Sequence, residues 1–418
     1  MPRLLLIAPF FPPMTRVGAK RPLMLARHLP AAGWEVVVLT TPSGYDPEDR
    51  TLERLIPEGV VVERTYSPPR PAVAAPTAPK PPSGGGGVLA NPYLSPFDRF
   101  LSHVPGAVKA AKALVARHRV DAISVCADPF TALFTGALAS RATGVPFVAD
   151  LRDPWALQAA KQAMRPAPSR WLVHRAERWA FARASQVVVN TEQALAAYRA
   201  AYAGRLAPAR FHEVRNAFDL GMFDPPVVHR PASFTVLHFG QFRLLVPAAP
   251  LLEAFARFVR DRALPPAQAR LAITGTFRAE DQAHADRLQL GPYLDVQPDV
   301  PYRTSLSVLR SAHVLAFVLD RRMEMTIPAK LYDYLAARRP IAALCDQPEP
   351  ARMVTDSQSG EVADPNDPAA GAALLGRAYD RFLSGGLPDL DPALAEPYSA
   401  RVQAERFAAV LAQAVAAR

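Results

Sequence analysis

The chain has 418 residues, of which half are hydrophobic and 21% are charged, a composition typical of globular proteins and not of disordered or fibrous ones. This length is sufficient for two domains. The two cysteines, Cys126 and Cys345, are far apart in the sequence and indicate neither a disulfide framework nor a metal cluster. No run approaches the roughly 18 apolar residues of a membrane-spanning helix, and residues 4–8 are too few for a signal peptide, so we expect a cytoplasmic protein.

The net charge of +10 is unevenly distributed. Residues 1–230 carry 28 basic and 17 acidic side chains, whereas residues 231–418 carry 20 and 21. A basic first half suits an anionic membrane surface, a diphosphate-bearing acceptor or nucleic acid. The alternative is simple solvation combined with an arginine-rich codon bias. We expect no nucleic-acid binding, because the chain contains no recognised module for it.

Short apolar runs alternate with helical patterns through the first half, beginning with a strand and then a helix over residues 19–29. The strands are predicted at residues 3–8, 35–40, 60–63, 122–126, 146–149, 186–189 and 212–214. Strands separated by helices indicate a parallel sheet with right-handed crossovers. Residues 67–90 interrupt this pattern with Pro, Ala and Gly, and are predicted to be a flexible surface loop inserted in the first domain; a tether between domains is the alternative.

A second series begins near residue 233. Its strands are predicted at residues 234–239, 270–274, 294–297, 314–319 and 340–345, with a helix starting at Pro250. The segment 224–231 is the predicted linker, which gives domains at 1–226 and 232–395. The predicted fold class is therefore α/β, with two Rossmann-like, doubly wound domains facing a central cleft. Ligands of such sheets bind at the carboxyl ends of the strands.

Four segments, in this order, resemble the family 4 retaining glycosyltransferases of the GT-B fold. They are FFPPMTRVGAKRPLMLARHLPAAGWEVVVLT (residues 10–40), GVPFVADLRDPW (144–155), VRNAFDLGMF (214–223) and, within residues 300–341, IPAKLYDYLAARRP (327–340). The resemblance extends over nearly the whole chain. It implies a nucleotide-sugar donor site in the second domain, an acceptor site in the first, and a final helix over 400–418 that packs on the first domain.

The fourth segment carries most of the predicted donor site. A helix that begins near Pro328 directs free N–H groups and a positive dipole at a diphosphate. Lys330 lies in its first turn and adds a mobile positive charge. Asp333 lies one turn further, where the family usually has a Glu that binds the nucleotide ribose. The alternative is that Lys330 and Asp333 form an ordinary surface pair. The full set of predicted donor-binding residues is Gly240, Arg243, Thr326, Ile327, Pro328, Lys330, Leu331 and Asp333.

Two features modify this donor site. Gly240 and Arg243 follow the strand at 234–239, the usual position of a phosphate cradle, and Arg243 is predicted to stabilise the charge on the departing diphosphate; a solvated loop arginine is the alternative. Met325 occupies the position at which the family has a Glu that contacts the donor sugar, with Glu324 beside it. His238, within the strand, is interpreted as a core residue.

The predicted acceptor side comprises Gly18, Lys20, Arg21, Arg152, Asp153 and Trp155. Gly18 permits a close approach to ligand at a helix start, next to two cations; a tight turn is the alternative. Asp153 follows a buried strand and is predicted to position or deprotonate the acceptor hydroxyl, with Trp155 offering an apolar face to a sugar ring. The alternative is that Asp150 or Asp153 caps a helix or pairs with Arg152.

Two basic amphipathic stretches, residues 96–119 and 169–183, suit either an anionic lipid surface or ordinary helices with one face on the core. The predicted reaction is transfer of a sugar, with retention, from a nucleoside diphosphate to a hydroxyl acceptor that is a saccharide or is lipid-linked. The predicted catalytic residues are Asp153, Arg243 and Lys330, and we expect no metal or other cofactor. The predicted location is cytoplasmic, and the basic first half extends this prediction to peripheral association at the inner membrane face. The alternatives are a non-catalytic nucleotide-sugar-binding protein and a nucleotide-sugar epimerase of the same fold.

Overall fold

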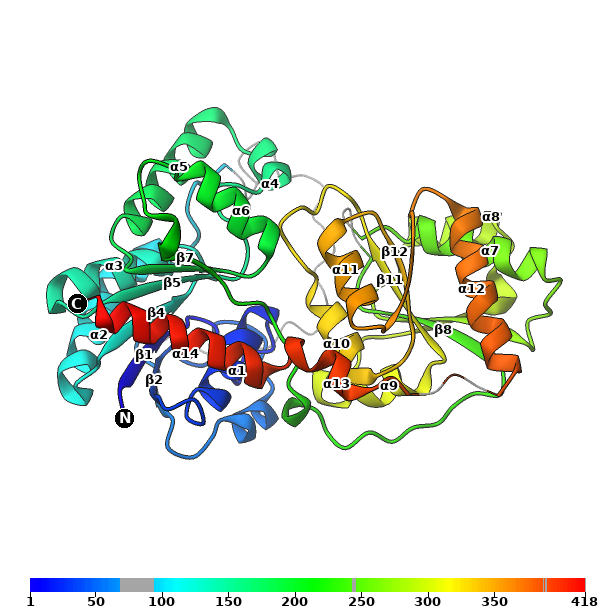
Figure 1. Ribbon diagram of the computed structural model, residues 1–418, viewed down its shortest axis with the longest axis horizontal. Helices are drawn as coiled ribbons and strands as arrows, with labels where there is room; N and C mark the ends of the chain where they lie inside the picture. The colour runs from blue at the N-terminus through cyan, green and yellow to red at the C-terminus, as the bar shows by residue number, and fades with distance from the viewer. Residues whose placement is uncertain (68–93, 243–245, 386, 388, 418) are drawn as a thin grey trace. The chain divides into compact units, whose positions relative to one another are not determined.

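The computed structural model describes residues 1–67, 94–242, 246–385, 387 and 389–417. The chain forms two compact units (Figure 1). The first unit comprises Met1–Asn216 and Ala400–Arg418, and the second comprises Ala217–Ser399. The predicted Pro/Gly-rich loop at 67–90 lies outside the described residues from residue 68 onward.

The first unit is built on a parallel sheet with the strand order β3-β2-β1-β4-β5-β6-β7. Its central strands are buried runs of aliphatic residues, as expected for a parallel sheet that is covered on both faces. The strands are β1 (Arg3–Ile7), β2 (Glu35–Leu39), β3 (Val61–Glu63), β4 (Ala122–Cys126), β5 (Phe147–Leu151), β6 (Gln186–Val189) and β7 (Phe211–Glu213).

Helices connect these strands and cover the sheet. They are α1 (Lys20–His28), α2 (Val104–His118), α3 (Ala132–Thr143), α4 (Ala159–Ala163), α5 (Ala167–Phe181), α6 (Glu192–Ala201) and α14 (Ala400–Ala416). Helix α14, the last in the chain, packs beside α1 in this unit (Figure 1). Its Phe407 and Leu411 are fully buried, and the Gln403 side chain accepts a hydrogen bond from the Arg215 N–H at 2.8 Å.

A buried carboxyl group, Glu177 of α5, ties three segments of the first unit together. Its oxygens accept hydrogen bonds from the Ala156 N–H (2.8 Å), the Tyr198 hydroxyl (2.9 Å) and the Tyr202 hydroxyl (3.0 Å). Burial raises its pKa to about 7, although the three hydrogen bonds act in the opposite direction.

This raised pKa predicts a pH-dependent stability. Between the ordinary carboxyl pKa and about 7 the folded state binds a proton that the unfolded state has lost, so the free energy of unfolding falls as pH rises through that window. We expect Glu177→Gln to lack this pH dependence. From the lower to the upper end of the window, the free energy of unfolding of wild type should therefore fall by up to about 3 kcal/mol relative to that of the variant. Urea denaturation of both proteins on each side of the window measures the difference. Parallel pH profiles would contradict the prediction.

The second unit has its own parallel sheet, in the order β10-β9-β8-β11-β12-β13. The strands are β8 (Phe234–Phe239), β9 (Ala269–Thr274), β10 (Leu294–Gln297), β11 (Val314–Leu319), β12 (Ile341–Cys345) and β13 (Gly360–Ala363). The helices are α7 (Ala249–Asp261), α8 (Ala279–Arg287), α9 (Ser305–Ser311), α10 (Ala329–Ala337), α11 (Pro348–Asp356), α12 (Pro368–Leu383) and α13 (Pro392–Ala395).

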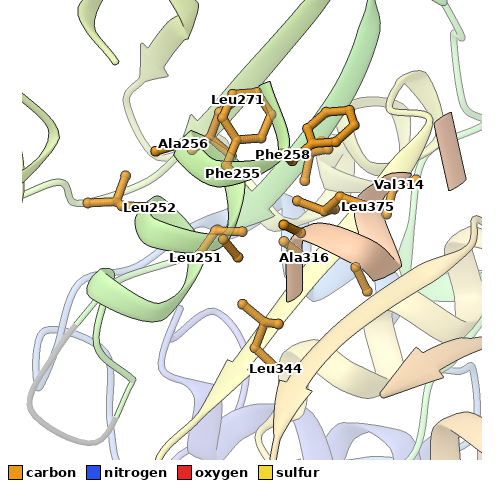
Figure 2. Close-up of a cluster of buried hydrophobic side chains, with 14 of the residues drawn as sticks. Leu251, Leu252, Phe255, Ala256, Phe258, Leu271, Val314, Ala316, Leu344 and Leu375 are labelled. Atoms are coloured by element: carbon orange, nitrogen blue, oxygen red, sulfur yellow. The ribbon is translucent and has the colours of Figure 1, made fainter. Parts of the chain in front are cut away.

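Alternation along β11 divides the core of this unit into two layers. Val314, Ala316 and Val318 point to one face, where they pack with the side chains of α7 and α12 (Figure 2). Leu315, Phe317 and Leu319 point to the other face, where residues of α9, α10 and α11 cover them. Both faces of the sheet are therefore sealed, and the carboxyl ends of the strands are left as the edge where polar groups gather.

The chain divides into units at Asn216, earlier than the predicted boundary of 226 and 232. The Phe218 N–H donates to the Tyr398 carbonyl, and the Asp224 N–H donates to the Arg303 carbonyl, so residues 217–224 pack with the second unit. Strand β13 was not predicted from the sequence. No helix within the described residues is long and apolar enough to cross a membrane.

Candidate functional site

Two glycines shape the carboxyl edge of the second sheet. Gly240 follows β8 with φ +103°, and Gly275 follows β9 with φ +134°. A Cβ atom on Gly275 would lie 2.5 Å from the Gly240 carbonyl oxygen. The Gly240 N–H donates to the Thr274 carbonyl at 2.8 Å, which keeps the two loops together. Backbone therefore forms this part of the edge, and a ligand can approach it closely.

Helix α10 begins at the same edge, where the sequence predicted a helix start. Pro328 is its N-cap residue, and no side chain caps the helix. The nearby Thr326 hydroxyl is buried and has no hydrogen-bond partner among the described residues. An uncapped helix N-terminus with an unsatisfied buried hydroxyl beside it favours an anionic ligand.

Lys330 extends from the first turn of α10 toward Gly240. Its Nζ atom lies 3.1 Å from Nε2 of His238, and 3.6 Å from the position that a Cβ on Gly240 would occupy. The alternative reading of Lys330 and Asp333 as a surface pair is wrong, because Lys330 bonds His238 and Asp333 is only 7% exposed. The helix start and a cation thus meet at the glycine loops.

Asp333 lies one turn further along α10. Its Oδ1 accepts a hydrogen bond from the Tyr302 hydroxyl at 2.9 Å. Burial, together with the charge of Asp333, raises the pKa of Tyr302 well above its ordinary value, so the phenol stays a donor. Tyr302 orients the carboxylate, and no pattern in the sequence predicts this contact. The assignment of Asp333 to the ribose stays a prediction.

The remaining predicted donor residues differ in what they offer. Ile327 and Leu331 are buried in the apolar core below α10, so their side chains serve packing and only their backbone is available to a ligand. Arg243 lies outside the described residues. Met325 has φ +57°, which is uncommon for a residue other than glycine, and its side chain is buried.

Charged side chains gather at the corresponding edge of the first sheet. Arg152, just after β5, lies between two carboxylates: Nη1 is 3.2 Å from Asp128 and Nη2 is 3.3 Å from Asp153. Asp128 follows β4, and its Oδ2 would lie 2.5 Å from a Cβ on Gly18. What requires glycine at position 18 is therefore the approach of Asp128. Partial burial raises the pKa of Asp128, and Arg152 opposes that effect.

Both units thus present polar residues at the carboxyl ends of a doubly wound parallel sheet. Residues 18–217 match the model of the glycosyl transferase 4-like domain family. These residues belong to the glycosyl transferase 4-like family. The resemblance to family 4 glycosyltransferases, predicted from the sequence, is confirmed, and the glycosyl transferase 4-like domain covers the first unit from residue 18 to Asn216, without residues 1–17 and α14.

Solved structures extend the likeness to the whole chain. A sucrose-phosphate synthase from Thermosynechococcus elongatus is 19% identical, with a TM-score of 0.58 and coverage of 100% of this chain and 97% of that one. HepE from Anabaena, in complex with UDP-glucose, is 15% identical, with a TM-score of 0.57 and coverage of 99% and 98%. A putative UDP-N-acetylglucosamine 2-epimerase from Listeria monocytogenes is 14% identical, with a TM-score of 0.56 and coverage of 97% and 94%. These matches confirm the predicted GT-B fold. No curated protein sequence matches the chain.

Arg21 of the glycosyl transferase 4-like domain is part of the core, and the prediction that it contacts an acceptor is therefore corrected. Arg21 is 4% exposed, and its guanidinium forms a bidentate ion pair with Asp150, with contacts of 2.7–3.0 Å. It also donates to the carbonyls of Val214 and Arg215. These bonds link α1, β5 and the segment after β7 inside the core. Lys20, the first residue of α1, is half-buried.

Trp155 requires a second correction in the glycosyl transferase 4-like domain. The sequence predicted an open indole face for a sugar ring, but the side chain is 3% exposed. Its ring stacks on Phe130, with centroids 5.2 Å apart and an angle of 4° between the planes. The indole therefore belongs to the aromatic core beneath the edge. Asp153 does pair with Arg152, as one alternative reading proposed.

Two residues at these edges were missed or misread. Asp128 lies two residues after the end of a buried strand, as Asp153 does, and this shared position was the available signal. The strand pattern predicts a core position for His238, and its ring is fully buried, but its Nε2 atom also contacts Lys330. A histidine within the otherwise apolar FTVLHF was the signal for it.

Proposed function

We propose that the protein transfers a sugar from a nucleoside diphosphate sugar to a hydroxyl acceptor. The observation that carries this proposal is the meeting, within the second unit, of the uncapped start of α10, the Lys330 ammonium and the Gly240 backbone. Such a combination of dipole, cation and bare backbone suits a diphosphate. The likeness in fold to HepE, which was solved with UDP-glucose, supports the choice of nucleotide sugar.

In the proposed reaction, the bond between the anomeric carbon and the diphosphate oxygen breaks, and a bond from that carbon to the acceptor oxygen forms. The negative charge that develops on the leaving diphosphate is stabilised by Lys330 and by the N-terminus of α10. This protein cation supports the further proposal that no metal ion is needed. The acceptor proton is taken by Asp153, whose carboxylate Arg152 orients. The stereochemistry is proposed to be retention.

The first experiment is a thermal-shift screen of ADP, GDP, UDP, CDP and dTDP and their common sugars, followed by an assay of nucleotide release. Stabilisation by one nucleoside diphosphate is expected, with release of that nucleotide only when an acceptor is added. Release or isomerisation with the donor alone would favour an epimerase. If the nucleotide sugar binds but no turnover occurs with any of a broad range of tested acceptors, a non-catalytic binding protein would be favoured. Activity that survives EDTA treatment is the expected result for a metal-independent enzyme.

We further propose that the acceptor is lipid-linked and that the first unit meets an anionic membrane surface. On α5, Trp171 and Leu172 are 57% and 38% exposed, and Arg175 lies over the Trp171 ring at 5.0 Å. Arg170 and Arg178 are also exposed on this helix, whereas Val173 and Phe181 face the core. Exposed apolar residues among arginines are typical of a helix that lies at a lipid interface.

This membrane proposal predicts binding to vesicles that contain phosphatidylglycerol, and weaker binding to vesicles of phosphatidylcholine alone. Trp171→Ala combined with Leu172→Ala is expected to reduce co-sedimentation about tenfold or more, because each bulky apolar side chain contributes on the order of 1 kcal/mol or more at an interface. Leu383→Ala, at an exposed leucine of the second unit, is the matched control. Equal sedimentation of the variant and wild type would exclude α5 as the contact.

A further inference from the structure

We propose that His238 is a positioning residue: its neutral imidazole holds the Lys330 ammonium over Gly240, where the diphosphate of the donor binds. That a diphosphate binds here rests on the proposed function, whereas the contact between His238 and Lys330 is observed independently of it. His238 therefore does more than pack in the core, because it also sets the position of the Lys330 ammonium group.

The His238 ring has one orientation and one tautomer. Its Nδ1 atom lies 3.2 Å from the Ala316 carbonyl oxygen, and a carbonyl only accepts, so Nδ1 carries the hydrogen. The Tyr334 hydroxyl donates to the same oxygen at 3.2 Å and accepts from the Phe239 N–H at 3.0 Å. Phe242 stacks on the imidazole with centroids 3.9 Å apart. These contacts anchor the ring between β8, β11 and α10.

The other nitrogen, Nε2, then has a free lone pair that faces Lys330. An ammonium group only donates, so the 3.1 Å contact is a hydrogen bond from Nζ to Nε2. Complete burial and the nearby Lys330 charge both hold the pKa of His238 well below its ordinary value. The titratable groups that its contacts reach are Lys330 and, through the Ala316 carbonyl, Tyr334. The imidazole is therefore neutral at working pH.

A neutral acceptor suits this position better than a carboxylate would. A carboxylate at the same distance would bind the lysine as an ion pair and cancel its charge toward a phosphate. The imidazole instead fixes the direction of one N–H bond and places no negative charge beside the lysine. Because the ring is rigid, the long lysine side chain loses rotamer freedom on folding rather than on ligand binding.

The test uses two amide substitutions of similar size in the full chain. In His238→Gln the amide oxygen can reach the position of Nε2 and accept from Lys330, whereas in His238→Asn the amide reaches only the position of Nδ1. Isothermal titration with UDP, or with whichever nucleoside diphosphate stabilises the wild type, is compared with titration of the matching nucleoside. We expect Asn to weaken diphosphate binding about tenfold with little effect on the nucleoside, and Gln to restore most of the loss.

Nitrogen-15 NMR of labelled histidine provides a readout that needs no ligand. The expected spectrum of His238, assigned by its absence in His238→Gln, is that of a neutral ring protonated on Nδ1, with an Nε2 shift that changes in Lys330→Met. A ring protonated on Nε2, or an Nε2 shift indifferent to Lys330→Met, would overturn the proposal even if no nucleotide binds. Equal weakening of nucleoside and diphosphate by His238→Asn, or none, would also overturn it. Failure of every nucleotide to bind wild type, with the expected NMR, would instead count against the proposed function alone.

Discussion

Replacing Lys330 with alanine is expected to lower kcat/KM for sugar transfer by about 10²- to 10³-fold, the usual effect of removing a group that stabilises charge in a transition state. The loss arises because Nζ is the cation that lies over the Gly240 backbone at the start of α10. Much of the effect should fall on kcat, since the diphosphate gains charge as the glycosidic bond breaks. Initial rates of nucleotide release over a range of donor concentrations measure both constants.

Two further variants define what Lys330 contributes. Lys330→Arg keeps the charge but presents a broad, planar group to His238, and is expected to recover only part of the activity. Arg260→Ala removes an exposed cation from α7 in the same unit and should behave as wild type. If Lys330→Ala and the control Arg260→Ala both had the kcat/KM of wild type, the diphosphate would have to bind elsewhere.

Gly275→Ala is expected to damage the second unit and its site together. The residue has φ +134°, a conformation that side chains with a Cβ rarely adopt, and the new Cβ would lie 2.5 Å from the Gly240 carbonyl oxygen. The neighbouring atom is backbone, so the loops after β8 and β9 must separate. We expect a loss of about 2–4 kcal/mol, seen as a fall in melting temperature of about 5–10 °C, and loss of nucleotide binding.

The control for this substitution is Gly291→Ala. Position 291 has no atom within 4 Å of an added Cβ, and its φ is not positive, so the substitution should change the melting temperature little. Calorimetry and nucleotide titration of the two variants together separate the cost of any glycine replacement from the cost of opening this edge. A Gly275→Ala protein that melts and binds like Gly291→Ala would show that the two loops are not held in contact.

The sequence predicts the strands and the helix starts well because these depend on local patterns. FTVLHF and VLAFVL are apolar runs bounded by turn residues, and β8 and β11 have the predicted bounds. Strand β13 escaped prediction because GEVA has few apolar residues and lies at the edge of its sheet. Helix α10 was found because Pro328 favours a helix start.

The contacts of the candidate site were harder to predict, because they join residues far apart in the chain. Nothing near Lys330 in the sequence indicates His238, which is 92 residues away, or that Tyr302 would bond Asp333. Trp155 and Arg21 were misassigned for the same reason: a residue type that suits a ligand also suits the core, and only Phe130 and Asp150, brought close by folding, distinguish the two. Side-chain pairing across elements carries no local pattern.

The position of α14 has a consequence for biosynthesis. The second unit is one continuous segment, Ala217–Ser399, whereas the first unit needs residues 400–416 to cover α1. During translation, the second unit can therefore complete its core while the first still exposes the surface that α14 will cover. The first unit can be completed only after the intervening segment Ala217–Ser399 has been synthesised. Ribosome-bound chains that end before residue 400 should therefore bind chaperones through α1, and full-length chains should release them.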